Sequence, residues 1–304
     1  MYDLKRINSY KDIKQLYNQC FGIDHSIDRI KRKYDTQMFG LKDIGFIAYK
    51  EAPAAYYGVF PITLYYHGKD YLVAQSGDTM TAPEHRNKGL FIQLAINTYI
   101  LAAYEKIKLV FGFPNKQSYP GFKDKLGWKF YGYMQRFEFN VLTIPFCELA
   151  SKFPVLKSWY KRFVKNTLSN YVVDKADFAH SKAYIKKDAN FIDYKLKGEN
   201  VYLISFYGVG MLIKADKHLY IGEVTHPTLP DPMYCDMLLT RVKLLAHKLG
   251  CKKIIFTVSK NHWLYNILST EKKPKRSLPI GFYIIDKNID PSVIQFTHAD
   301  FDTF

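Results

Sequence analysis

Paired cysteines are missing from this sequence of 304 residues. The four that are present lie far apart and form no Cys-x-x-Cys pair: Cys20, Cys147, Cys235 and Cys251. Structural zinc sites and disulfide frameworks need closely spaced or paired cysteines. We therefore expect neither a metal site nor disulfides, and the composition favours a reducing compartment, the cytoplasm.

Long apolar runs are also absent. No run approaches the roughly 18 residues of a membrane span, and the polar stretch at residues 1–14 does not resemble a signal peptide. We therefore expect a cytoplasmic protein without a membrane span. Aromatic residues are abundant, with 25 Tyr and 22 Phe, which excludes a disordered chain and indicates a globular one.

Acidic residues are few relative to basic ones, 28 against 44, which gives a net charge of +16. The Lys residues are spread along the chain, as is usual for a solvated surface. The excess still favours an anionic ligand or surface, such as a phosphorylated small molecule, an acidic polysaccharide, tRNA or an anionic membrane face.

Residues 76–128 carry the most information. A strand is predicted over about residues 72–81 and is stopped by Pro83, which has no N–H to donate. A long apolar helix is predicted over residues 89–106, and a short buried strand over residues 109–113. Strand, helix, strand is a βαβ unit, so the two strands should be parallel neighbours.

The turn into this helix has the properties of a phosphate site. Residues 86–91 read RNKGLF. The first N–H groups of a helix lack internal partners, and the helix dipole places positive charge there. Gly89 removes a side chain where a ligand would approach, and Arg86 and Lys88 add charge. The site would suit a pyrophosphate; the alternative is a helix start that merely carries a Gly and two bases.

Residues 81–89, TAPEHRNKG, resemble the acetyl-CoA loop of the GNAT superfamily of N-acetyltransferases. The family pattern is Val-x-Pro-x-x-(Arg/Gln)-x-x-Gly-x-(Gly/Ala). Thr81 takes the Val place, whereas Phe91 stands where Gly or Ala is usual, so we expect the phosphate turn to be tighter or shifted. The pairs Asn115 with Ser118, and Gly127 with Trp128, resemble the family's second half-motif. The resemblance covers residues 45–139.

The resemblance implies an α/β (α+β) GNAT fold, a mixed and mostly antiparallel sheet with a central βαβ unit flanked by helices. It implies an acyltransferase that moves an acetyl group from acetyl-CoA, its co-substrate, to a small-molecule primary amine, without a metal. The residues that it assigns to acetyl-CoA are Met80, Thr81, Ala82, Arg86, Asn87, Lys88, Gly89, Leu90, Phe91, Asn115 and Ser118.

Two residues are candidates for the proton chemistry. The family often uses a Tyr four residues before the Gly of its second half-motif, but Lys123 stands there, so Tyr119 is the nearest substitute. Its alternative role is ring packing. Asp78 lies on the strand that ends at Thr81 and is the candidate base; its alternative role is that of a hydrogen-bonded carboxylate of the strand.

The remainder of the first domain, residues 1–142, is predicted as two helices (10–19 and 26–34), then strands at residues 44–50, 54–66 and 71–75, and a closing strand at 133–141. We expect the second of these strands to be interrupted near Pro61. Residues 143–180 are predicted to be a helical connector, with basic and aromatic helical pieces that suit either a linker or a membrane surface.

Residues 181–304 repeat the first domain in outline. Strands are predicted at 195–207, 210–215 and 218–224, a helix at 233–249, and strands at 254–258 and 280–285. Thr225 precedes His226-Pro227 as Thr81 precedes Ala82-Pro83, which suggests a structural duplicate. The duplicate lacks Arg-x-x-Gly, and its turn at residues 228–232 carries Asp231 between two prolines. We therefore expect a degenerate second copy without a phosphate site.

Two other functions fit the sequence. Enzymes that transfer amino acids from aminoacyl-tRNA to cell-wall peptides also pair two GNAT-like domains. In those enzymes the loop tends to lose its resemblance to the CoA-binding type, which the loop of this sequence keeps. A nucleic-acid partner is therefore the weaker expectation. A non-catalytic scaffold that binds an anionic partner is the third. The acceptor amine stays open; an amino sugar of surface polysaccharide synthesis is favoured by the many aromatic residues, which stack on sugar rings. The sequence gives no oligomeric state.

Overall fold

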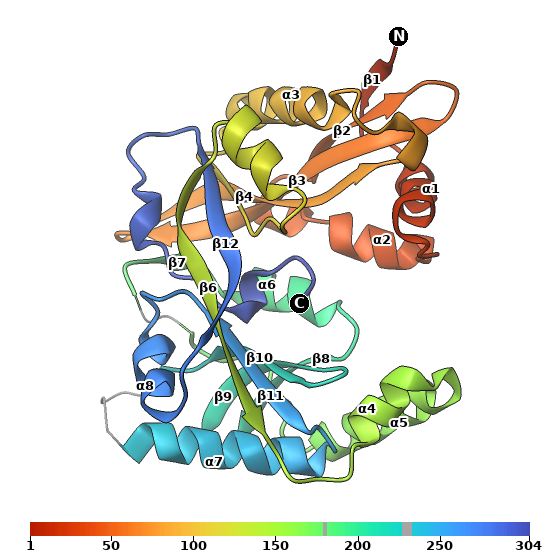
Figure 1. The fold of residues 1–304 in the computed structure, drawn as a ribbon. Coiled ribbons are helices and arrows are strands. Elements are labelled where there is room, and N and C mark those ends of the chain that lie inside the picture. Colours follow the sequence, from red (N-terminus) through yellow and green to blue (C-terminus); the bar gives the residue numbers. More distant parts are fainter. Residues whose placement is uncertain (179–180, 227–232) are drawn as a thin grey trace. The chain divides into compact units, whose positions relative to one another are not determined.

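In the computed structural model, residues 1–178, 181–226 and 233–304 are described (Figure 1). They form two compact units. Unit 1 comprises Met1–Gly132 and Leu278–Val293, and unit 2 comprises Tyr133–Ser277 and Ile294–Phe304. Each unit is a mixed α/β structure around a mostly antiparallel sheet, so the predicted fold class is confirmed.

Unit 1 is built on a sheet with one parallel pair. Its strand order is β1 (Asp3–Arg6), β2 (Ile44–Tyr49), β3 (Pro53–Tyr66), β4 (Lys69–Thr81), β5 (Leu109–Gly112) and β12 (Lys275–Ile284). Strands β4 and β5 are parallel, and they are joined through α3 (Leu90–Tyr104). The βαβ unit predicted from the sequence is therefore confirmed.

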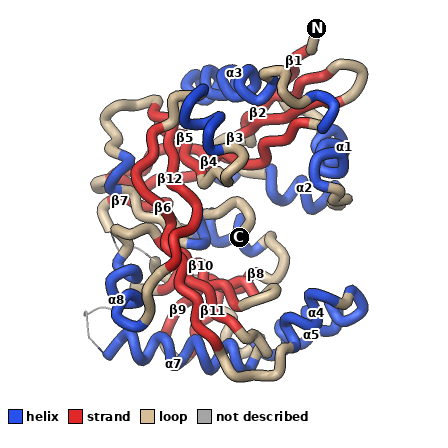
Figure 2. The backbone as a smooth tube through the Cα atoms, viewed as in Figure 1, coloured by secondary structure: helices blue, strands red, loops and turns tan. Residues whose placement is uncertain are grey.

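Helices cover both faces of the unit 1 sheet (Figure 2). Helix α3 packs on one face, and α1 (Tyr10–Phe21) and α2 (Ile27–Tyr34) pack on the other. The neighbours Tyr56 and Tyr57 show the alternation, because Tyr56 is buried under α1 and α2 and Tyr57 under α3. Both predicted N-terminal helices are confirmed, and the Ser26 side chain caps α2 by accepting from the Arg29 N–H.

The predicted interruption of β3 near Pro61 is wrong. Strand β3 runs unbroken, and Pro61 lies opposite Ala74 of β4. The pairing of β2 with β3 begins at Ile44 opposite Val59, so Pro61 lies beyond the end of β2. A proline is tolerated there because no β2 residue needs its missing N–H.

Unit 2 has a similar sheet. Its strand order is β6 (Lys129–Asn140), β11 (Lys253–Val258), β10 (Leu219–Val224), β9 (Val209–Ala215) and β8 (Val201–Phe206). Strands β10 and β11 are parallel and are joined through α7 (Met233–Lys248). The other helices and the short strand are α4 (Phe146–Lys152), α5 (Pro154–Leu168), β7 (Ala183–Ile185), α6 (Ala189–Leu196) and α8 (Trp263–Glu271).

The strand predicted at 195–207 starts too early in the sequence. Lys195 lies in α6, and β8 begins at Val201. Asp188 starts α6 because its side chain accepts from the Phe191 N–H. The Lys195 ammonium donates to the Phe301 carbonyl over 2.7 Å, which holds the end of α6 in the unit 2 core.

The pairing of β5 with β12 and that of β11 with β6 repeat with one offset. In unit 1 Phe111 of β5 pairs with Phe282 of β12, and in unit 2 Phe256 of β11 pairs with Phe137 of β6. Phe256 lies 145 residues after Phe111, and Phe282 lies 145 residues after Phe137. The internal duplication predicted from the sequence is therefore present in the strand pairing.

This register also shows that the units differ from the expected contiguous domains, 1–142 and 181–304. The equivalent strands β6 and β12 are exchanged, because β5 pairs with β12 and β11 pairs with β6. Each unit takes its last strand from the other half of the sequence. Within the described ranges no helix is long and apolar enough to cross a membrane.

Candidate active site

Strands β4 and β5 part soon after they pair. Ala74 pairs with Val110 and Gln75 with Phe111, and β5 ends at Gly112. In the described part of the chain, no strand other than β3 pairs with β4 residues 76–81. We call this region the first splay. On the β5 side, the backbone edge of these residues pairs with no strand of the described ranges.

A β-bulge in β4 lies within the first splay. Gly77 pairs with Gly58 and Met80 with Tyr56, so Asp78 and Thr79 together oppose one residue of β3. Asp78 has a φ of 46°. Ser76 still hydrogen-bonds Tyr57 on the α3 face, over 2.9 Å. The bulge turns Asp78 towards α1 and α2, although residues two apart in a regular strand share a face.

Three donors from α1 and α2 converge on the Asp78 carboxylate. The Tyr17 hydroxyl donates to Oδ2, as does the Tyr34 hydroxyl over 2.9 Å. The Lys33 ammonium lies 2.7 Å from Oδ1, and the Asp78 side chain is only 11% exposed. Burial, and then the charge of Asp78, raise the pKa of both Tyr17 and Tyr34 well above the usual tyrosine range. Both hydroxyls therefore stay neutral and act as donors.

These three partners were not assigned to the site from the sequence. The available signal was the position of Tyr17 on the apolar face of the first predicted helix, and of Lys33 in the basic turn of the second. The sequence does not reveal the bulge that points Asp78 at these three side chains.

The loop after β4 leads into an uncapped helix. Gly89 is the N-cap of α3 with a φ of 75°, and no side chain caps the first turn. A Cβ built at Gly89 would meet no atom within 4 Å. The left-handed backbone explains the glycine, and the open space is what a ligand at the first N–H groups of α3 requires.

The basic side chains of this loop lie beside the start of α3. Arg86 donates from Nε to the Thr81 carbonyl over 3.3 Å, and Lys88 donates from Nζ to the Glu84 carbonyl over 2.9 Å. Both residues are exposed, and neither forms its bond with a carboxylate. Their charges therefore add to the positive end of α3.

Phe91 does not obstruct this turn. Its ring centroid lies 5.1 Å from that of Phe122 and 5.8 Å from that of Tyr57, on the core side of α3. Gly121 makes the room, because a Cβ there would come within 2.6 Å of the Phe91 ring. Phe91 thus replaces the family's Gly or Ala, and the missing side chain at Gly121 makes room for its ring.

The other predicted residues lie after β5. Asn115 accepts through Oδ1 from the N–H groups of Gln117 (2.9 Å) and Ser118 (3.0 Å), so it caps the following turn. The Tyr119 ring packs on Phe130, with centroids 4.5 Å apart. These contacts show a structural role for Asn115 and packing for Tyr119; neither contact involves Asp78.

Unit 2 contains an equivalent, second splay, between β10 and β11. Their parallel pairing ends at Ile221 opposite Phe256, and β10 shifts register at Gly222. Gly222 precedes Thr225 by three residues, as Asp78 precedes Thr81. Strands β4 and β10 therefore both carry a bulge near the splay, but not at the same place, because Asp78 follows the last parallel pair by three residues and Gly222 follows it by one.

The C-terminal segment of the chain fills the second splay. Thr297 bridges Val258 of β11, and the Ser259 N–H donates to the Phe296 carbonyl over 2.8 Å. A Cβ at Gly222 would overlap the ring of Phe304. The segment thus contacts both strands where they part.

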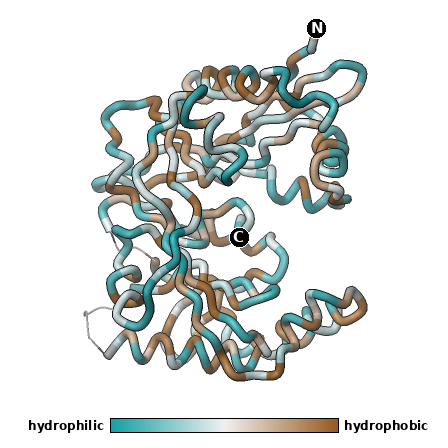
Figure 3. Tube along the Cα trace, viewed as in Figure 1, coloured by the Kyte–Doolittle hydropathy of each residue, from teal (hydrophilic) through white to brown (hydrophobic). Residues whose placement is uncertain are grey.

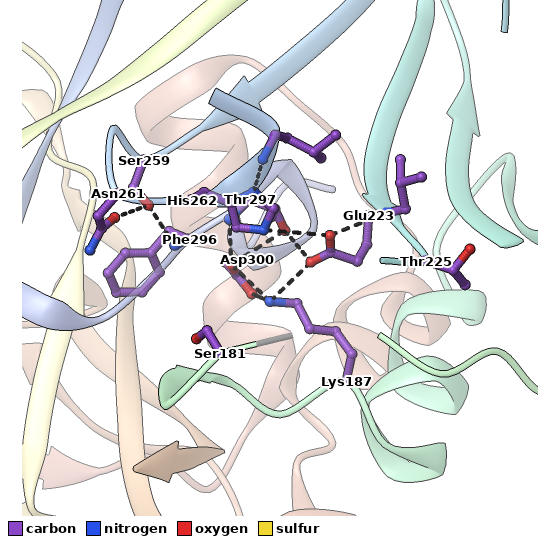
Figure 4. A network of polar contacts seen from close by, with 12 residues as sticks. Ser181, Lys187, Glu223, Thr225, Ser259, Asn261, His262, Phe296, Thr297 and Asp300 are labelled. Atoms are coloured by element: carbon purple, nitrogen blue, oxygen red, sulfur yellow. Dashed lines mark hydrogen bonds and ion pairs between the residues drawn. The ribbon is translucent and has the colours of Figure 1, made fainter. Parts of the chain in front are cut away.

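A buried charge network holds this segment in place (Figure 4). The Lys187 ammonium lies 3.4 Å from a Glu223 oxygen and 3.0 Å from Asp300, and all three side chains are at most 1% exposed. Thr297 donates to Glu223 over 3.1 Å. Burial raises the pKa of Glu223 to about 7 against the opposing effect of Lys187. The predicted loss of a phosphate site at residues 228–232 rests on residues outside the described ranges.

Comparison with known proteins relates most of unit 1 to one family. Residues 3–131 match the profile of the family described as "Acetyltransferase (GNAT) domain". This part of the chain is similar to GNAT acetyltransferase domains. No curated protein matches the chain.

Solved structures share the fold over both units. A GCN5-related N-acetyltransferase from Kribbella flavida is 14% identical with a TM-score of 0.57, over 94% of this chain and 72% of that one. A probable N-acyltransferase from Enterococcus faecalis V583 is 16% identical with a TM-score of 0.56, over 94% and 73%. A putative acetyltransferase from Pyrococcus horikoshii is 10% identical with a TM-score of 0.52, over 97% and 93%. At these identities the likeness shows the fold alone.

Proposed function

We propose that unit 1 transfers an acetyl group from acetyl-CoA to a primary amine. The observation that carries the proposal is the coincidence of two features at one end of a βαβ unit. The parallel strands part beyond Gln75 and Phe111, and the uncapped helix that joins them begins at Gly89 in open space. An extended acyl-carrying chain fits the first feature, and its pyrophosphate fits the second.

The backbone of β4 and the start of α3 would hold acetyl-CoA. The Ala82 N–H donates to Ala54 of β3, so the backbone of Thr81, one residue earlier, faces the open side of β4. Met80 and Ala82 have buried side chains, and the Ala82 N–H and carbonyl already bond Ala54 and His85, so Thr81 is the residue of the three whose backbone would meet acetyl-CoA. The N–H groups of Leu90 and Phe91, with Arg86, Asn87 and Lys88, would surround the pyrophosphate. When bound, acetyl-CoA supplies an activated thioester carbonyl.

The protein's contribution is to position the amine and move protons. The amine nitrogen attacks the carbonyl carbon, the C–N bond forms as the C–S bond breaks, nitrogen loses a proton and the sulfur gains one. Asp78 is the proposed base because it lies in the first splay on the side of α1 and α2. Tyr119 is retained as the proposed acid.

Asp78→Asn is expected to lower kcat by roughly 10²–10⁴, the usual range for a general base. Affinity for acetyl-CoA should barely change, because the proposed contacts use backbone groups. Steady-state rates from about pH 6 to about pH 10, with a thermal melt of the same sample, check this. If Asp78 only anchors α1 and α2 to the bulge, the variant will instead melt earlier and keep its pH–rate profile.

Tyr34→Phe is the matched control for that experiment. It removes one donor to Asp78, the 2.9 Å bond, and leaves the carboxylate in place. A base role predicts a small rate effect for Tyr34→Phe and a large one for Asp78→Asn; an anchoring role predicts similar losses of stability in both. Tyr119→Phe in the same assay tests the proposed acid.

We expect one acetyl-CoA per chain. The first splay has an open backbone edge, whereas the C-terminal segment already contacts both strands of the second, through Thr297 and Phe304. Calorimetric titration should give a stoichiometry of about one. Two equivalent sites would contradict the proposed degeneracy of unit 2.

The acceptor is proposed to be an amino sugar. The Tyr17 ring stands edge-on to that of His25, with centroids 4.8 Å apart and Tyr17 bonded to Asp78, so two aromatic rings adjoin the proposed base, and the half-buried His25 is the more exposed of them. Such rings pack on sugar faces. Mass analysis of products from amino sugars, polyamines and peptide amines in parallel tests this; acetylation restricted to polyamines or peptides would refute the sugar and keep the transferase.

A further inference from the structure

Helices α4 and α5 of unit 2 carry a dense group of exposed apolar side chains. Val155 is 88% exposed, Phe153 54% and Trp159 53%. We define the apolar cluster as six residues: Phe146, Leu149, Phe153, Val155, Leu156 and Trp159. All six are at least 36% exposed. Figure 3 shows hydrophobic residues along both helices.

The cluster is separate from the face of α5 that joins the core. Tyr160, Val164 and Leu168 are spaced four apart, are buried and pack in the unit 2 core. Val155 and Trp159 are also four apart, but they belong to a different stripe. The helix therefore has two apolar stripes, and only one of them is used by the fold.

The aromatic part of the cluster is preorganised. The Trp159 ring stacks on that of Phe163 with centroids 5.7 Å apart and an interplanar angle of 8°. Phe146 of α4 meets Trp159 edge-on, with centroids 6.0 Å apart. Phe163 itself packs against the core. The fold therefore already orders the exposed rings, so little side-chain conformational entropy is lost when a partner binds.

Basic residues surround the apolar cluster. Residues 142–170 contain five Lys or Arg and a single acid, Glu148, a net charge of +4. Glu148 is itself paired with Lys152 over 2.8 Å. Lys161, Arg162 and Lys165 are exposed on α5. A bilayer with anionic headgroups offers both apolar depth and opposite charge.

We propose that the apolar cluster and its basic residues dock unit 2 on an anionic lipid surface. Tryptophan and lysine beside exposed aliphatic side chains form the pattern of an interfacial helix. Nucleic acid fits less well, because Val155 and Leu156 are aliphatic and find no apolar partner on a phosphate backbone. The docking is independent of the proposed acetyl transfer, since no cluster residue belongs to unit 1.

Trp159 allows a direct test with the intact protein. The chain has three tryptophans, and Trp128 is buried, Trp263 half-buried and Trp159 exposed. Vesicles of phosphatidylcholine with about one third phosphatidylglycerol should sediment the protein and shift its emission to the blue. Acyl chains brominated in the outer leaflet should quench the emission. The Trp159→Phe variant should sediment but lose the shift and the quenching.

Two variants separate the two parts of the proposal. Val155→Ser with Trp159→Ser should reduce vesicle binding at least tenfold, and Lys161→Glu with Lys165→Glu should abolish the preference for anionic lipid. The matched control is Ile100→Ser with Tyr104→Ser, which alters exposed apolar residues of α3, 65% and 81% exposed.

The proposal would be overturned by no sedimentation with anionic vesicles, by equal loss in the α3 control, or by concentration-dependent self-association that the Val155 and Trp159 variant removes. The last would make the cluster an interface between two copies of the chain. Retention of tRNA by the wild type, without vesicle binding, would also contradict it.

Discussion

Gly89→Asp is expected to abolish acetyl-CoA binding, weakening it by at least about 100-fold, or roughly 2.7 kcal/mol. The substitution places a carboxylate in the open space at the start of α3. Two like charges about 4 Å apart near a protein surface repel by about 4 kcal/mol. Calorimetric titration with acetyl-CoA measures the loss.

The variant should remain folded. Aspartate is among the residues that tolerate a left-handed backbone such as that of Gly89, and a negative charge at the start of α3 favours the helix dipole. Gly68→Asp is the matched control, because Gly68 has a φ of 88° and open space but lies in the β3–β4 turn. Unchanged affinity in a folded Gly89→Asp protein would remove the main support for a phosphate site.

Lys187→Met is expected to lower the free energy of unfolding by about 3–5 kcal/mol, the cost of leaving buried charges without a partner. Glu223 and Asp300 are both 0% exposed, and Lys187 lies between them. Urea unfolding of the full chain measures the change. Lys275→Met is the control, since this Lys is 72% exposed and pairs with Glu138; its effect should stay within about 1 kcal/mol.

The loss in Lys187→Met should depend on pH. The pKa of Glu223 is raised from 4.5 to about 7, so the folded protein holds this proton more tightly than the unfolded chain. The corresponding stability is present below pH 4.5 and is lost as the pH rises through about 7. Without Lys187 the ionised carboxyl costs still more, so the defect should be larger at about pH 8.5 than at about pH 5.5.

A double variant tests the reason for this loss. Lys187→Met combined with Glu223→Gln should recover part of the stability and flatten the pH dependence, because one buried charge is gone. A Lys187→Met protein as stable as the wild type at all pH values would show that the network does not hold the C-terminal segment against the second splay.

The βαβ unit of unit 1 could be predicted because its signals are local. Pro83 stops β4, Gly89 starts α3 and the apolar run from Leu109 makes β5, and each of these depends only on its neighbours. The predicted strand from residue 195 failed because Lys195 and Leu196 are the last residues of α6, whose start is set by the Asp188 cap upstream of the predicted strand.

The exchange of β6 and β12 could not be read from the sequence. The two strands are equivalent in the repeat, so either could pair with β5 or β11 on local pattern alone. Tertiary contacts decide which edge each strand joins. The bulge at Asp78 escaped for the same reason, because its position depends on the register of β3 against β4. The proposed roles of Asp78 and Tyr119 remain predictions.

Release of free CoA is the measurement that tests the account most directly. The wild-type chain is incubated with acetyl-CoA and pools of amines, and the thiol is measured, with Gly89→Asp in parallel. We expect free CoA to be released only when an amine is present and residue 89 is the wild-type glycine. Wild-type protein that binds no acetyl-CoA, or that releases no thiol above the Gly89→Asp background with any pool, would contradict an acetyltransferase and favour a non-catalytic scaffold.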